Sequence, residues 1–122
     1  MTRRDRGSAS LTTVVLTPVA IAVALAAFQA ALWTHARTEA RAIARDAAVL
    51  VARSGEPAGA VQASSERLLD EQQSLTAAAI DIDETGPSLV VVTVDGTAPG
   101  IFRWTERPFV VVEAVPREGF RP

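Results

Sequence analysis

An uncharged stretch of 23 residues, from Leu11 to Trp33, lies near the start of this 122-residue chain. At a rise of about 1.5 Å per residue, a helix of this length measures about 34 Å, enough to cross the roughly 30 Å hydrocarbon core of a bilayer. Trp33 ends the stretch, where aromatic side chains favour the boundary between membrane and water. The sequence therefore predicts a transmembrane helix, and only the residues after it are left to build a folded domain.

Two interpretations of this stretch are open, a retained anchor and a cleaved signal peptide. Arginines at positions 3, 4 and 6 precede it, as in either kind of segment. The apolar core of a signal peptide usually has about 7 to 15 residues, which is shorter than this stretch. A small-residue cleavage site behind it is also interrupted by Phe28, Leu32 and Trp33. These features favour a retained, single-pass anchor.

Three further arginines, Arg37, Arg41 and Arg45, follow the stretch at four-residue spacing. They rival the arginines before it, so the positive-inside rule does not decide the orientation. On a helix this spacing places them on one face as a like-charged row. We expect that face to be solvated. Contact with phospholipid headgroups or with acidic residues of a neighbouring subunit is the alternative, which makes the three arginines interface candidates.

The helix is expected to continue beyond the membrane. Residues 34–53 contain neither Gly nor Pro, and apolar residues recur at helical spacing. The sequence at 54–57, Ser-Gly-Glu-Pro, should end the helix, because Gly is a common terminator and Pro disfavours helical geometry in the residue before it. We predict one helix from about Ser10 to Arg53, with an apolar face made of Ala36, Ala40, Ile43, Ala47, Leu50 and Val51.

The rest of the chain has the pattern of a small α+β unit. A weak apolar stripe from Gly59 to about Ser74 predicts a short second helix. Apolar and polar residues then alternate, as in a strand, at 78–83, and the valine-rich residues 88–96 and 108–115 also predict strands. The expected fold class is α+β, with a small antiparallel sheet of about three strands. We expect a leader at 1–7, the transmembrane helix and its extension at 8–53, and an extracytoplasmic domain at 54–122.

Alternation also predicts which strand side chains face the core. A shift of either of the last two strands by one residue would turn Asp95 or Glu113 inward, so the register should be well specified. Two sets of side chains are therefore expected to lie together on one face, Val90, Val92 and Val94 from one strand and Val110, Val112 and Ala114 from its neighbour.

Composition argues against several kinds of chemistry. The chain has no cysteine and one histidine, His35, which is a poor basis for a catalytic or thiolate metal site. Its net charge of −2, without a basic field, argues against nucleic acid. We expect no enzyme, no catalytic, cofactor or metal-binding residue and no small-molecule substrate. Carboxylates that could suggest a calcium site are expected on the solvent face of a strand and in a turn, at Asp81, Asp83, Glu84 and Asp95.

The connection between the last two strands carries Ile101, Phe102 and Trp104. Large apolar side chains in a loop either fold back onto the sheet as a lid or form a contact surface. We expect the lid, with Arg103 directed outward. Phe102 and Trp104 are the interface candidates if the alternative holds.

Pro18 lies inside the predicted span and cannot donate a hydrogen bond to the carbonyl of Val14. An unsatisfied carbonyl in hydrocarbon costs several kcal/mol. The hydroxyl of Thr17 can reach back three or four residues, to Val14 or Thr13, and compensate. The other interpretation is that Thr17 is a tolerated small residue.

The order of residues 3–18, RRDRGSASLTTVVLTP, is basic residues, a glycine, a small polar residue and an apolar helix. It resembles the class III signal of type IV pilin-like proteins and, with Pro18 eleven residues after Gly7, the TadE-like proteins of actinobacterial tight-adherence clusters. This resemblance implies cleavage between Gly7 and Ser8 by a prepilin peptidase at the cytoplasmic face. It also implies a cytoplasmic N-terminus, an exported C-terminal domain, and partners among other pilin-like subunits and the tight-adherence machinery.

One position departs from that family. The family usually has a glutamate five residues after the cleavage glycine, and Thr12 stands there in this sequence. Such a carboxylate is thought to pair with the amine of a neighbouring subunit, so Thr12 favours a minor, tip or non-incorporated member. Two other functions remain as alternatives, a generic membrane-tethered accessory or scaffold protein outside any pilus and a secreted domain with a cleaved signal.

Overall fold

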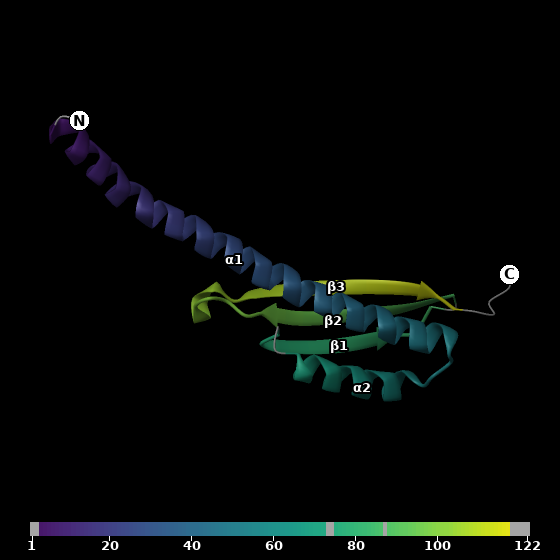
Figure 1. Cartoon of the computed structure of the whole chain (residues 1–122). Helices are drawn as coiled ribbons and strands as arrows, with labels where there is room; N and C mark the ends of the chain where they lie inside the picture. Colours follow the sequence, from purple (N-terminus) through teal and green to yellow (C-terminus); the bar gives the residue numbers. More distant parts are fainter. Residues whose placement is uncertain (1–2, 73–74, 87, 118–122) are drawn as a thin grey trace.

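The computed structural model describes residues 3–72, 75–86 and 88–117. It confirms the α+β class, with a long apolar N-terminal helix, a short second helix and a three-stranded antiparallel sheet (Figure 1). The elements are α1 (Arg3–Arg53), α2 (Ala58–Glu71), β1 (Ala77–Asp83), β2 (Leu89–Ala98), the short 3-10 helix η1 (Arg103–Thr105) and β3 (Arg107–Pro116).

Helix α1 runs without interruption for 51 residues. It begins at Arg3, seven residues before the predicted start at Ser10, because the residues between contain no proline and a single glycine costs a helix only about 1 kcal/mol. It ends where predicted. Gly55 adopts a φ of +67°, which turns the chain away, and the amides of Ser54 and Glu56 both donate to the carbonyl of Leu50.

The two parts of α1 have different surroundings, and we call them the span (residues 11–33) and the extension (residues 34–53). The first half of α1 projects away from the sheet, whereas its second half lies across it (Figure 1). Small side chains line the buried face of the extension and let the helix lie close to the strands. The buried residues of the extension are Ala36, Ala40, Ile43, Ala44, Ala47, Ala48, Val51 and Ala52. Leu50, which was expected on that face, is exposed.

The sheet has the order β1-β2-β3, and both pairs are antiparallel. Helix α1 packs against β2 and β3, and α2 packs against β1 and α1. Both helices therefore cover the same face of the sheet, and the core lies between them and the strands. In β2, Val90, Val92 and Val94 are fully buried, as the alternation predicted. Helix α2 buries Val61, Ser65 and Leu69. It ends at Glu71, before the predicted end at Ser74, which lies outside the described residues.

The predicted face of β3 is wrong. Phe109, Val111 and Val115 are buried, whereas the expected Val110, Val112 and Ala114 lie on the opposite, exposed face. The register pairs Val94 with Val111 and Val92 with Glu113, so Glu113 points to the helix side. That side tolerates a carboxylate because Arg41 of α1 lies across from it, with Nε 3.5 Å from Oε1 of Glu113.

Candidate functional site

The span of α1 exposes a long apolar surface. One helix in the described part of the chain is long and apolar enough to cross a membrane, and its most apolar 18-residue window has no buried residue. Such a surface is stable when hydrocarbon replaces water around it. A single membrane-anchoring helix near the N-terminus is therefore what this structure supports. The exposed large side chains of the span are Leu11, Val14, Val15, Leu16, Val19, Ile21, Val23, Leu25 and Phe28.

Pro18 lies within this helix, and the hydroxyl groups near it bond to the backbone one turn earlier. Thr17 donates to the carbonyl of Thr13 at 2.6 Å, and Thr13 donates to the carbonyl of Ala9 at 3.0 Å. Of the two acceptors predicted for Thr17, the structure selects Thr13. Pro18 has no amide hydrogen to donate to the carbonyl of Val14, and Thr17 does not donate to that carbonyl either.

Gly7 and Ser8, the predicted processing site, both lie in the first turns of α1. Gly7 is exposed, and an added Cβ there would have no heavy atom within 4 Å. Thr12 is also exposed, five residues further along the same helix. Gly7 and Thr12 are accessible to another protein, and cleavage between Gly7 and Ser8 stays a prediction.

The three arginines of the extension have different partners. The guanidinium of Arg37 lies over the ring of Trp33, 5.2 Å from its centroid, a cation–π contact at the end of the span. Arg41 pairs with Glu113, and Arg45 is exposed. The face that carries the three arginines is therefore not uniformly solvated, because Arg37 contacts Trp33 and Arg41 contacts Glu113.

Sequence reasoning missed Gln29, which joins the span to the domain. Its Oε1 accepts a hydrogen bond at 3.0 Å from the backbone amide of Ile101, 72 residues away in the sequence. Its Nε2 is buried and has no partner in the described part of the chain. A signal for this residue was present, because a side-chain amide within a long apolar stretch needs a polar partner.

The loop between β2 and β3 carries an exposed aromatic pair. Phe102 and Trp104 are 48% and 82% exposed, and their rings stack with centroids 5.5 Å apart. The predicted lid on the sheet is therefore wrong for these two residues. Thr105 fixes the loop from within, since its hydroxyl donates to the carbonyl of Phe102 at 2.8 Å and accepts from the amide of the same residue at 3.0 Å.

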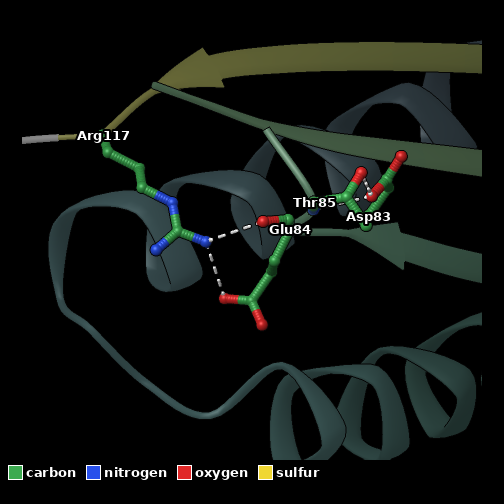
Figure 2. Close-up of polar contacts among 4 residues, drawn as sticks. All are labelled: Asp83, Glu84, Thr85 and Arg117. Atoms are coloured by element: carbon green, nitrogen blue, oxygen red, sulfur yellow. Dashed lines mark hydrogen bonds and ion pairs between the residues drawn. The ribbon is translucent and has the colours of Figure 1, made fainter. Parts of the chain in front are cut away.

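The carboxylates near the β1–β2 turn are used in local contacts. Asp83 accepts hydrogen bonds from the side chain and the backbone of Thr85, at 2.6 and 2.8 Å, and these bonds lower the pKa of Asp83 (Figure 2). Arg117 donates to the Oε1 and the carbonyl of Glu84, at 3.2 and 3.4 Å, which ties the end of β3 to this turn (Figure 2). Among residues 3–72, 75–86 and 88–117, no three acidic or histidine side chains gather to hold a metal ion.

Comparisons with protein-family models, with curated proteins and with solved structures find no match to this chain.

Proposed function

We propose that this chain is a non-enzymatic, membrane-anchored, pilin-like protein of the TadE type, a component of a tight-adherence pilus or a related secretion apparatus. The observation that carries the proposal is the division of α1. One continuous helix offers an apolar span with no buried residue in its most apolar window, and then forms one side of the core of a small sheet domain. Gly7 and the basic residues at positions 3, 4 and 6 stand directly before that span.

This arrangement suits a subunit that is held in a bilayer before assembly. The same apolar surface can pack against lipid or against the spans of other subunits, because neither surrounding requires a charge to be buried. The proposed orientation places the leader in the cytoplasm, where a prepilin peptidase would cut between Gly7 and Ser8. The sheet domain is then extracytoplasmic.

The test is the intact mass of the full chain recovered from cells that carry the cognate peptidase. We expect loss of residues 1–7, and we expect Gly7→Val to retain them, because a side chain obstructs the close approach of the backbone to the peptidase. Gly59→Val is a matched control, since Gly59 is also an exposed helical glycine with no atom within 4 Å of an added Cβ. This control should be processed like the wild type.

Equal processing of the Gly7→Val and wild-type chains would refute the proposal. Loss of no more than Met1 from the wild type would instead favour the accessory or scaffold protein outside a pilus. Loss of about 30 residues would indicate a signal peptide of the type that precedes secreted domains.

Thr12 bears on the second candidate function, a membrane-tethered accessory or scaffold protein outside a pilus. An unpaired charged side chain costs about 2.5 to 3.5 kcal/mol at the centre of a membrane span and less near its end, where Thr12 lies. Thr12 avoids this cost, and so it allows the span to remain in lipid without a partner subunit. This favours a minor, tip or non-incorporated member over a major filament subunit, and it is the one observation that favours a tethered accessory protein.

A further inference from the structure

The aromatic loop between β2 and β3 lies beside the end of the span. The hydrogen bond from Ile101 to Gln29 joins the loop to α1 four residues before Trp33. A groove of about 430 Å³ continues the junction toward β3 and is lined by Ala26, Gln29, Ala30, Trp33, Arg107 and Pro108. The hydrogen bond therefore places the loop next to the span, and the groove places the start of β3 next to it.

The depth of the junction follows from helix geometry. Four residues correspond to about 6 Å along the helix axis, so Gln29 lies about 6 Å inside the apolar stretch that ends at Trp33. The span is about 34 Å long and the hydrocarbon core is about 30 Å thick, with several ångströms of headgroup region on each side. Whichever way α1 crosses the bilayer, the loop lies at the boundary between acyl chains and headgroups.

The side chains of the loop have the chemistry of that boundary. Phe102 and Trp104 are exposed to solvent although they are the largest apolar residues of the loop. Arg103 lies between them in the sequence, Arg107 follows at the start of β3, and both arginines are exposed. Glu106 is the one acidic residue between positions 99 and 107. Tryptophan is enriched at membrane boundaries, and each arginine near an anionic lipid surface contributes about 1 kcal/mol.

We infer that the β2–β3 loop is a second membrane contact, with Phe102 and Trp104 inserted among the lipids and Arg103 and Arg107 at the phosphates of the same bilayer that α1 crosses. The hydrogen bond from Ile101 to Gln29 sets the depth of the loop. Attachment through both α1 and the β2–β3 loop would fix the tilt of the sheet relative to the membrane. This inference depends on α1 as a membrane span and does not depend on assignment to a pilus.

The two tryptophans of the chain allow a direct test with brominated acyl chains, which quench indole fluorescence on contact. The full chain with Trp33→Phe has Trp104 as its only tryptophan and keeps an aromatic ring under Arg37. It is reconstituted into vesicles of phosphatidylcholine and phosphatidylglycerol, with and without brominated phosphatidylcholine. We expect strong quenching of Trp104 and an emission maximum shifted to the blue of that in water.

Two reporters make the result interpretable. The Trp104→Phe chain reports from Trp33, which must be quenched if α1 lies in the bilayer. A chain with Trp33→Phe, Trp104→Phe and Leu89→Trp reports from the opposite end of the sheet, where Leu89 is exposed at the start of β2, and it should not be quenched.

A displaced loop should lose the contact. A Cβ added to Gly100 would come within 2.6 Å of the carbonyl of Phe102 and would collide with the hydroxyl of Thr105. Gly100→Ala should therefore reduce quenching of Trp104 while the circular dichroism of the chain is unchanged. Changing Arg103 and Arg107 to Gln should reduce the dependence of quenching on the phosphatidylglycerol fraction.

Trp104 quenched no more than the Leu89→Trp reporter, in vesicles where Trp33 is quenched, would overturn the inference. The loop would then be a surface for a neighbouring protein. Absence of quenching at Trp33 would also overturn it, because α1 would not lie in the bilayer, whereas the peptidase experiment above would still stand as a test of the pilin-like function.

Discussion

Replacing Ala44 by leucine should weaken the contact between the α1 extension and the sheet. Ala44 has no exposed surface and lies on the helix face that is packed against the strands. Leucine and alanine have similar helix propensities, so the substitution changes packing much more than it changes the helix. Extra carbon atoms in a close-packed core typically cost about 1 to 3 kcal/mol, since neighbouring side chains must leave their preferred rotamers.

For a domain of this size, 1 kcal/mol corresponds to about 4 to 8 °C in Tm, so a central cost of about 2 kcal/mol predicts a decrease of about 8 to 16 °C. Thermal unfolding in detergent, followed by Trp33 fluorescence in a Trp104→Phe background, measures this change. Ala42→Leu is the matched control, because Ala42 lies on the same helix and is exposed. Its free energy of unfolding should change by less than about 0.5 kcal/mol.

Similar small shifts for the two variants would show that the extension does not pack against the sheet through its alanine face. Similar large shifts would show that the exposed side of the extension is also covered. Either result would refute the reasoning from burial.

Two further predictions concern polar contacts. Hydrogen bonds from Thr85 lower the pKa of Asp83, so they stabilise the turn at neutral pH, and this stabilisation is lost as the pH falls through the lowered pKa. Thr85→Val should raise the pKa of Asp83 toward its ordinary value, as measured by NMR titration of the carboxyl group. In the span, Thr17 donates to the carbonyl of Thr13, whereas Pro18 leaves the carbonyl of Val14 without a backbone donor. The effects of Thr17→Val and Pro18→Ala on stability should therefore add to within about 0.5 kcal/mol, and a larger coupling energy in a double-mutant cycle would show that the two residues cooperate.

Sequence periodicity was sufficient to predict the two α-helices, the three strands and their order, but not the short 3-10 helix η1. The end of α1 followed from the Gly and Pro at positions 55 and 57. The core face of β2 followed from the two-residue spacing of Val90, Val92 and Val94, with Thr93 and Asp95 on the other face. These features are local, because a period or a turn residue acts within a few positions of the chain.

The face of β3 could not be predicted in the same way. Apolar residues occupy every position from Phe109 to Val112, so both faces of the strand have the same pattern. A carboxylate is expected to point to solvent, so Glu113 predicts the wrong face. Its partner Arg41 lies on α1, and a contact between such distant positions is not encoded in the alternation of one strand.

The same limit applies to the candidate site. Gln29 was visible as a polar residue in an apolar stretch, but its bond to Ile101 depends on the path of a loop 72 residues later. The exposure of Phe102 and Trp104 also depends on that path. Hydrophobicity alone favours burial of such side chains, so it predicts a lid where the structure has an exposed pair.

We expect residues 11–33 of α1 to lie in lipid, whereas residues 34–53 pack on a folded domain. Because the chain has no cysteine, single cysteines can be placed along α1 and spin-labelled in vesicles, where oxygen and a water-soluble nickel complex report lipid and water. We expect oxygen accessibility to exceed nickel accessibility throughout the span, without helical periodicity apart from the positions next to the loop. Beyond Trp33, accessibility should vary with a period of about 3.6 residues. Nickel accessibility with that same period along the whole of α1 would contradict the claim, since it would mean that the span packs against protein in water.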